Sequence, residues 1–379
     1  MSRTCVAHVI TQLELGGAQQ NTLYTVSHLD RGQFAPALLA GPGGALDAEA
    51  RALSDVPFFA LPDLQRAIAP ARDLYALGQL RRLLRLLPRP LIVHTHSSKA
   101  GALGRLAARS IGADAVVHSV HGFAFHDRQR APTRASYIAI ERSLASLADA
   151  YVCVSLADRE RGQRLGLFGS AHVELIRSGI VFDEFRFSEA ARQRIRRQLA
   201  IPPAAPTVGT IANFKPQKAP LDFVATAVAV LDKWPDVHFV YVGDGALRPA
   251  VEAAVASARV GHRVHLVGWQ TDIGAYLSSF DLFLLTSHHE GLPRSVLQAR
   301  VNGCPVVATR TGGTDEVVPA ADLAAPGDVA ALAHLVEQRL VGLGPRVPSA
   351  LPDDLLPFSA ERMVRDQERL YRRLLGQKQ

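Results

Sequence analysis

Short apolar segments alternate with helical patterns along almost the whole chain, at intervals typical of strand–helix–strand units. Because parallel strands are joined through helices and are buried on both faces, this alternation predicts a doubly wound α/β fold. Strands are expected at 4–10, 35–41, 91–96, 115–120, 150–155, 173–177, 207–213, 237–243, 263–268, 281–286 and 304–308, and helices at 17–30, 99–112, 134–148, 219–233 and 246–259.

The chain is long enough for two domains. It has 379 residues, more than one hydrophobic core usually holds. The composition shifts over residues 178–206, which end in a Pro/Ala stretch before a new glycine-bearing strand. We therefore expect an N-terminal domain at 1–185, a C-terminal domain at 186–357 and a final helix at 358–379. Ser359 is placed to cap that helix.

The charge and cysteine content narrow the classes of partner. The net charge of +7 fits nucleic acid, a membrane surface or anionic substrates. The basic residues are dispersed and aromatic residues make up only 6%, so no nucleic-acid partner is expected. The sequence contains neither a long apolar run nor a signal-peptide pattern. Three cysteines, Cys5, Cys153 and Cys304, are far apart and flanked by apolar residues, which predicts buried thiols and a cytoplasmic location.

Residues 74–89 combine leucines at helical spacing with four arginines. Such a helix can lie on anionic lipid, which would place the protein peripherally at the inner face of the membrane. The same pattern is also typical of an ordinary surface helix with leucines toward the core. The sequence leaves both interpretations open.

Residues 280–316 predict a strand, a polar loop, a helix and a second strand. Pro293 stands where the helix begins and Gly303 where it ends. Free amides in the first turn, at 294–296, would suit a phosphate group. Glu290 precedes the helix and Gln298 lies one turn after Arg294. A carboxylate and an amide beside an anion site indicate a ligand with both phosphate and hydroxyl groups, such as a nucleotide sugar.

Two further motifs are weaker. His94 and His96, spaced by one residue on a strand, are compatible with a metal site. No acidic residue stands near them, so a structural strand-end pair is preferred and no metal is predicted. Gly243-Asp244-Gly245 has Arg248 where a dinucleotide fingerprint needs its third glycine, which disfavours a nicotinamide-dependent dehydrogenase.

Several segments together match a known family pattern. In the family pattern Glu, seven residues, Glu, the first position is matched by Glu290 and the second is Gln298 instead of Glu, and VVATRTGGTDEVV follows at 306–318. Residues 208–223 contain Lys218 at the position of a diphosphate-binding lysine, with Asn213 where an arginine is expected. The chain thus resembles the retaining GT-B glycosyltransferases of the large glycogen-synthase-like family over nearly its whole length. The resemblance implies two Rossmann-like domains facing a cleft, with the last helix crossing back to the N-terminal domain.

The resemblance also implies roles for individual residues. Glu290 and His121 would contact the transferred sugar, and Lys218 would stabilise the departing diphosphate. Gln298 would hydrogen-bond the ribose hydroxyls in place of the family's glutamate. Our own inference is that Lys215 supplies the charge missing at Asn213. The remaining donor-binding residues are expected to be Gly16, Gly17, Gly243, Gly291, Leu292, Arg294 and Ser295.

The implied reaction is a metal-independent, retaining transfer without a cofactor. The co-substrate would be a nucleoside-diphosphate sugar, with UDP-sugar the commonest in the family, and no protein nucleophile is needed. A lipid-linked saccharide acceptor, used in cell-surface polysaccharide synthesis, would fit the 74–89 helix. Two alternatives stay open: a nucleotide-sugar epimerase on the same fold, and a nucleotide-sugar-binding or scaffold protein without activity, which the departures at Asn213 and Gln298 would favour.

Overall fold

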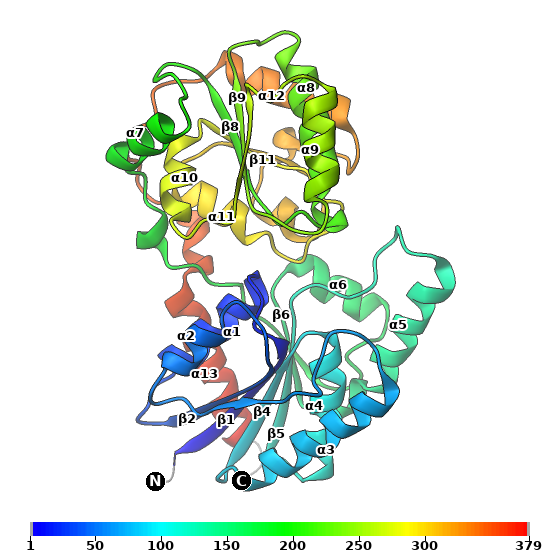
Figure 1. Ribbon diagram of the computed structural model, residues 1–379. Coiled ribbons are helices and arrows are strands. Elements are labelled where there is room, and N and C mark those ends of the chain that lie inside the picture. The colour runs from blue at the N-terminus through cyan, green and yellow to red at the C-terminus, as the bar shows by residue number, and fades with distance from the viewer. Residues whose placement is uncertain (1–2, 377–379) are drawn as a thin grey trace. The chain divides into compact units, whose positions relative to one another are not determined.

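The computed structural model describes residues 3–376. They form two compact units, and each is a parallel sheet covered by helices (Figure 1). The N-terminal unit holds the residues up to Gly179 together with those from Pro357 onward. The C-terminal unit holds Ile180–Leu356. The predicted fold class, two Rossmann-like domains, is confirmed.

The N-terminal unit is a parallel sheet of order β3-β2-β1-β4-β5-β6-β7. Its strands are β1 (Thr4–Gln12), β2 (Phe34–Gly41), β3 (Phe58–Ala60), β4 (Leu91–His96), β5 (Ala115–Val120), β6 (Ala150–Cys153) and β7 (His172–Leu175). Its helices are α1 (Gly17–His28), α2 (Asp47–Ala52), α3 (Pro70–Leu86), α4 (Ser98–Ser110), α5 (Ala131–Ser143), α6 (Leu156–Arg164) and α13 (Ala360–Gly376). The strand order reverses between β1 and β4. In open parallel sheets, ligands bind outside the carboxyl ends of the strands at such a point.

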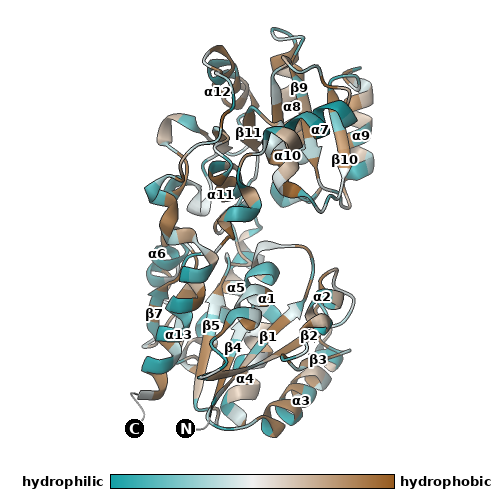
Figure 2. Cartoon of the chain, turned by 90° about the vertical axis from the view of Figure 1, so that its left-hand side faces the viewer, coloured by the Kyte–Doolittle hydropathy of each residue, from teal (hydrophilic) through white to brown (hydrophobic). Residues whose placement is uncertain are grey.

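The two faces of this sheet have separate cores because side chains alternate along a strand. On β1, Cys5, Ala7 and Val9 pack with residues of α3 and α4, whereas Val6 packs with α13. The strands are accordingly apolar on both faces, and they are brown in Figure 2. Helix α13 belongs to this unit, as expected. Ser359 caps it by accepting the Arg362 amide at 3.1 Å.

The C-terminal unit is a parallel sheet of order β10-β9-β8-β11-β12-β13, which reverses between β8 and β11. Its strands are β8 (Thr207–Ile211), β9 (His238–Val242), β10 (Val264–Gly268), β11 (Leu282–Leu285), β12 (Val306–Thr309) and β13 (Leu323–Ala324). Its helices are α7 (Glu189–Gln198), α8 (Pro220–Leu231), α9 (Arg248–Ser257), α10 (Ile273–Ser279), α11 (Arg294–Val301) and α12 (Val329–Val341).

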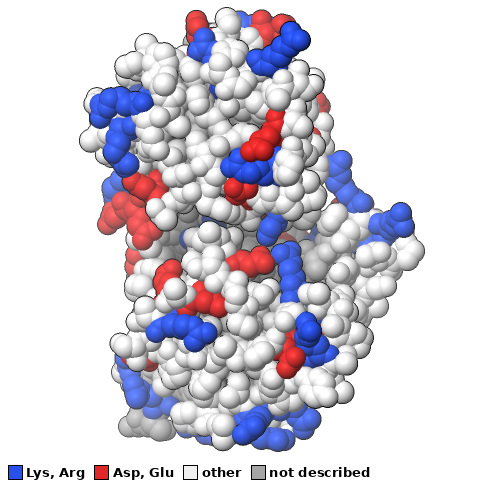
Figure 3. Space-filling view, viewed as in Figure 1, with Lys and Arg blue, Asp and Glu red and all other residues white. Residues whose placement is uncertain are grey.

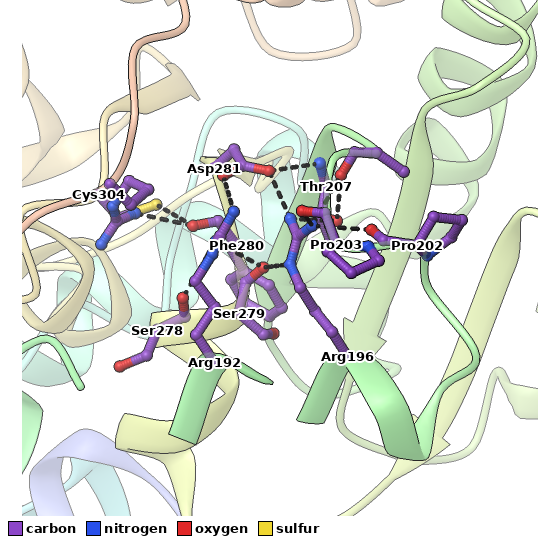
Figure 4. A network of polar contacts seen from close by, with 12 residues as sticks. Arg192, Arg196, Pro202, Pro203, Thr207, Ser278, Ser279, Phe280, Asp281 and Cys304 are labelled. Carbon is purple, nitrogen blue, oxygen red and sulfur yellow. Dashed lines mark hydrogen bonds and ion pairs between the residues drawn. The ribbon is translucent and has the colours of Figure 1, made fainter. Parts of the chain in front are cut away.

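Buried ion pairs fix α7 to the amino ends of β8 and β11 (Figure 4). Asp281 accepts from Arg192 and from Arg196, each at 2.6 Å, and also accepts the Thr207 amide at 2.9 Å. Arg196 is 3% exposed and donates to the carbonyls of Pro202 and Pro203 as well. The Pro/Ala stretch that the sequence identified as a border is therefore held to the second sheet.

The expected elements needed corrections mainly at their ends. The helix expected at 134–148 is α5, which ends at Ser143, followed by a short turn at Ala145–Leu147. Helix α3 begins at Pro70, before the 74–89 stretch. Within residues 3–376, no helix is both long enough and apolar enough to cross a membrane.

Candidate active site

Lys218 and Glu290 meet at the switch point of the C-terminal sheet. Lys218 ends a short turn, Pro216–Lys218, that follows β8, and Glu290 lies in the loop after β11. The Lys218 Nζ lies 2.6 Å from the Glu290 Oε1. The glutamate side chain is only 7% exposed, whereas the lysine side chain is 21% exposed. The carboxyl ends of two neighbouring strands thus present a cation and a carboxylate to each other.

Hydrogen bonds to backbone carbonyls hold the two loops together. The His288 amide donates to the Gln217 carbonyl at 2.7 Å, and the Gln217 side chain donates to the His289 carbonyl at 2.9 Å. The Thr286 hydroxyl donates to the Lys218 carbonyl at 3.1 Å. The positions of Lys218 and Glu290 are therefore fixed by the backbone on both sides of the ion pair.

The segment after β12 supports Glu290 from the other side. The Gly313 amide donates to the Gly291 carbonyl at 2.6 Å. Gly312 has φ +51°, and a Cβ there would lie 1.8 Å from the Glu290 carbonyl oxygen. Only glycine permits this approach, which explains Gly312 in the predicted segment 306–318.

The Gly243-Asp244-Gly245 loop packs on the segment that follows β8. A Cβ on Gly243, at φ +140°, would lie 2.0 Å from the Ala212 carbonyl oxygen. The Phe214 amide donates to the Asp244 carbonyl at 2.9 Å. These contacts position the half-buried Asn213 and Lys215. Backbone packing accounts for Gly243, and its contact with a donor stays a prediction.

Helix α11 corrects one expectation about the anion site. Pro293 is the N-cap residue, and its carbonyl accepts the Val296 amide at 3.1 Å. The prediction that the Val296 amide is free is wrong, because the first turn closes on Pro293. Arg294 begins the helix, and burial lowers the pKa of its guanidinium to about 10, opposed by the nearby charge of Glu184. Arg294 therefore remains a cation at neutral pH.

The other predicted residues of this segment are mostly buried. Leu292 and Gln298 are each 8% exposed, and Gly291 is buried, whereas Ser295 is half-buried. Gln298 lies one turn along α11 from Arg294, as the spacing predicted. A neutral amide at this buried position avoids the cost that an unpaired carboxylate would carry.

In the N-terminal unit, Gly16 and Gly17 join β1 to α1. Gly16 is the N-cap residue in an extended conformation, with φ −169°, which any residue adopts. A Cβ there would meet only the end of the Gln19 side chain, 2.7 Å from its Oε1. Neither a left-handed turn nor backbone packing explains this glycine, so close approach of a ligand stays the predicted reason for it.

His121 follows β5 and lies beside His96 at the end of β4. The His96 Nδ1 is 3.2 Å from the His121 Nε2, and the His96 Nε2 is 3.0 Å from the His8 Nδ1. His94 bonds the Tyr371 hydroxyl at 2.6 Å through Nδ1 and the Ser119 hydroxyl at 2.7 Å through Nε2. Sequence reasoning missed His8, which the pairing of β1 with β4 places opposite His94.

Ring nitrogens of His8, His94 and His96 lie within 4.8 Å of one another, close enough to consider a metal ion. All three rings are buried, and within residues 3–376 none of the three is paired with a carboxylate. Hydrogen bonds engage both nitrogens of His94 and of His96. The cluster therefore fits neutral, hydrogen-bonded imidazoles better than ligands of a dication.

Comparisons with known proteins agree with this architecture. Residues 15–184 match the model described as Glycosyltransferase Family 4, and residues 205–341 match that described as Glycosyl transferases group 1. The chain is 31% identical over 324 residues to the UDP-Gal:alpha-D-GlcNAc-diphosphoundecaprenol alpha-1,3-galactosyltransferase of Escherichia coli, covering 84% of this chain and 82% of that protein. The chain belongs to the GT-B glycosyltransferase family.

Solved structures show the same fold. HepE from Anabaena in complex with UDP-glucose has a TM-score of 0.80 at 18% identity, covering 98% of this chain and 100% of HepE. Sucrose-phosphate synthase from Thermosynechococcus elongatus has a TM-score of 0.79 at 18% identity, covering 99% and 100% of the two chains.

The residues predicted for the site of this glycosyltransferase lie in two groups. In the C-terminal unit, Lys218 and Glu290 are in direct contact, and the Gly-Gly segment after β12 holds the Glu290 backbone. In the N-terminal unit, His121 and the Gly16-Gly17 turn follow β5 and β1 at the carboxyl edge of one sheet. In both units these groups lie beside or near the reversal of strand order, where a ligand is expected.

Proposed function

We propose that this glycosyltransferase moves a hexosyl group from a UDP-sugar to a hydroxyl of a lipid-linked saccharide, with retention and without a metal ion. The Lys218–Glu290 ion pair at the switch point carries the proposal. Two relatives support the substrates: the E. coli enzyme is named for UDP-Gal and a diphosphoundecaprenol-linked GlcNAc, and HepE was solved with UDP-glucose.

The donor would engage the cation and the carboxylate separately. The ammonium of Lys218 suits the diphosphate, and the carboxylate of Glu290 suits hydroxyl groups of the sugar. In the structure these two groups hold each other in place at 2.6 Å. Gln298 would bond the ribose hydroxyls, while Lys215 and the start of α11 at Arg294 add positive charge near the phosphates.

The transfer needs no protein nucleophile. The bond between the sugar C1 and the β-phosphate oxygen breaks, and its electron pair stays on that oxygen. The acceptor hydroxyl forms the new bond to C1 on the same face, and its proton passes to the departing phosphate oxygen. Lys218 stabilises the negative charge that develops on the diphosphate, which is the largest electrostatic demand of the step.

The side chains at the proposed diphosphate site support a reaction without a divalent ion. Hard cations such as Mg²⁺ are held through carboxylates and phosphate oxygens. The carboxylate at this site, Glu290, faces Lys218 and in the proposed complex would accept from sugar hydroxyl groups. The Lys218 ammonium would then meet the diphosphate in the way that a metal ion does in other enzymes.

Helix α3 supports contact with an anionic membrane. Ala76, Leu80 and Leu84 face the core, as an ordinary amphipathic helix requires. Leu74, Tyr75 and Leu86 are nevertheless 69%, 70% and 74% exposed. At helical spacing they share a face with two exposed arginines, Arg82 and Arg85. Basic side chains also gather along the edge of the N-terminal unit near this helix (Figure 3). Exposed apolar groups among arginines are typical of a surface that enters the lipid headgroup region.

The test is an assay with UDP-Gal, UDP-Glc and UDP-GlcNAc, a GlcNAc-diphosphoundecaprenol acceptor and a chelator. Transfer of one sugar, with an α-anomeric product by ¹H NMR, is expected. A β-anomer would overturn retention, and activity restored only by added Mg²⁺ or Mn²⁺ would overturn metal independence. A changed sugar nucleotide without acceptor would indicate an epimerase, and UDP binding without turnover would indicate an inactive binding protein.

A further inference from the structure

A chain of histidines runs from the core of the N-terminal unit to His121. The contacts between the rings are His8 Nδ1 to His96 Nε2, 3.0 Å, and His96 Nδ1 to His121 Nε2, 3.2 Å. His8 and His96 are buried in the sheet, whereas His121 is half-buried. The three rings thus connect an interior strand position with the carboxyl end of β5.

The two inner rings are neutral. Burial lowers the pKa of His8 to about 3. Burial, together with the neighbouring imidazoles, lowers the pKa of His96 well below its ordinary value. A neutral imidazole has one N–H and one lone pair. Each contact between rings therefore holds one proton. The hydrogen bonds can point along the three rings in only two ways, from His8 toward His121 or from His121 toward His8.

His8, the buried end of this series of rings, decides in which direction the hydrogen bonds point. The Nε2 of His8 is buried and has no hydrogen-bond partner among residues 3–376. If His8 donates from Nδ1, the unpartnered atom is a lone pair; in the opposite direction it is an N–H. Buried N–H groups without an acceptor are rarer in proteins than acceptors without a donor. The favoured direction is thus His8 to His96 to His121, and His121 accepts at Nε2.

We propose that His8 and His96 are positioning residues that hold His121 as the Nδ1–H tautomer. His121 would then meet the transferred sugar as a neutral hydrogen-bond donor in a fixed ring orientation. The inference rests on the proposed function, in which His121 contacts that sugar. A donor held in place before the donor substrate arrives needs no reorganisation as charge develops on the sugar.

The neighbouring His94 belongs to a separate network. The Tyr371 hydroxyl donates to the Gln367 Oε1 at 3.2 Å, so it accepts from the Nδ1–H of His94. The Ser119 hydroxyl then donates to the His94 Nε2. A zinc ion among His8, His94 and His96 would break these bonds and place two positive charges among neutral rings. Zinc is therefore the alternative that the experiment must exclude.

The tautomers can be read directly from side-chain ¹⁵N spectra of the histidine-labelled protein. His121 is assigned with His121→Gln, and Tyr371→Phe serves as the control that removes a hydrogen bond of His94 and none of His8, His96 or His121. We expect Nδ1 of His121 to be protonated and Nε2 to be unprotonated. His96→Leu should give a mixture of tautomers, whereas His96→Asn, whose amide can donate from a place similar to Nδ1, should keep the wild-type tautomer.

Kinetics separate positioning from folding. His96→Leu should lower kcat roughly 10- to 100-fold with little change in the donor KM, and His96→Asn should recover most of the loss. An unchanged kcat for His96→Leu would overturn the positioning role. So would an Nε2–H tautomer of wild-type His121, or stoichiometric zinc with metal-shifted ring signals. The wild-type spectrum decides the tautomer even if His96→Leu does not fold.

A failure of the proposed function would look different. If His121→Gln retains full kcat while the wild-type spectrum shows the Nδ1–H tautomer, the hydrogen bonds from His8 through His96 to His121 are present but the contact of His121 with the sugar is wrong. Absence of the expected tautomer in an enzyme that needs His121 would instead overturn the positioning role of His8 and His96 and leave the proposed function standing.

Discussion

Lys218 and Glu290 form a 2.6 Å ion pair in which the carboxylate is almost completely buried. The pair joins the loops after β8 and β11, two strands that are neighbours only because the strand order reverses between them. A buried carboxylate that loses its cation is costly. A ligand that draws the lysine away must therefore offer hydroxyl groups to the glutamate at the same time, which a sugar diphosphate does.

Removing the cation should remove catalysis. Lys218→Ala is expected to lower kcat about 100- to 1,000-fold, because one preorganised charge on the leaving group is lost. Lys233→Ala is the matched control, since Lys233 pairs with Glu337 at 3.0 Å on an exposed surface away from the strand ends of the switch point. That variant should change kcat less than about twofold. A Lys218→Ala enzyme with near wild-type turnover would contradict the assignment.

Gly312 should be needed for the position of Glu290. An alanine there would adopt an unfavourable φ and would force the Glu290 carbonyl away from its 1.8 Å approach. The conformation alone costs about 1 to 2 kcal/mol. We expect Gly312→Ala to reduce kcat at least tenfold and to lower Tm by several degrees. Gly342→Ala is the control, because nothing lies within 4 Å of a Cβ at that position. Equal activity of the two variants would show that Glu290 tolerates displacement.

Much of the fold was predictable because it follows from local pattern. Periodicity predicts the apolar strands, and the shift in composition near 178–206 predicts the domain border. Several elements were not identified, among them the short β3 and the polar helix α6, because a three-residue strand and a helix with two buried residues leave almost no periodic signal.

The site was predictable only in part. Sequence motifs placed Lys218 and Glu290 after strands, but only the pairing of β8 with β11 brings them into contact. His8 carries no motif at all. It joins His96 because β1 pairs with β4, and the register between strands so far apart in the chain is not encoded locally. The Val296 amide was misjudged because the Pro293 carbonyl closes the first turn of α11.

Lys215 should replace the arginine that the family pattern expects at Asn213. Lys215→Ala is predicted to weaken UDP binding about tenfold by calorimetry, since one cation near the diphosphate is removed. Asn213→Arg in the Lys215→Ala background should restore the affinity, whereas Asn213→Gln, which adds length without charge, should not. Unaltered binding by Lys215→Ala would remove this residue from the donor site.

The exposed face of α3 should bind anionic vesicles. Leu74→Ser with Leu86→Ser removes apolar contact, and Arg82→Glu with Arg85→Glu reverses the charge. Each pair is expected to release the protein from phosphatidylglycerol vesicles at low salt, at roughly 1 kcal/mol for each arginine. Changing Leu80 would be uninformative because it lies in the core. If the wild-type protein fails to sediment with the vesicles, the proposal that α3 binds an anionic membrane is wrong.

Stability should fall steeply on acidification because four histidines are buried in the N-terminal unit. Burial lowers the pKa of His8 to about 3 and holds those of His94, His96 and His118 well below the ordinary value. Below about pH 6.5 the unfolded chain binds protons that the folded state excludes. The stabilisation is therefore fully present above that pH and is lost as the pH falls.

The expected slope is about 1.4 kcal/mol per pH unit for each histidine, or about 5.6 kcal/mol per pH unit for the four. Urea unfolding at pH 7.5, 6.0 and 5.0 measures it. His8→Asn should reduce the slope by about a quarter, because one excluded proton is removed. Ile92→Val, a conservative core change in the same unit, should lower stability equally at every pH. A wild-type slope near zero would mean that these rings accept protons in the folded protein.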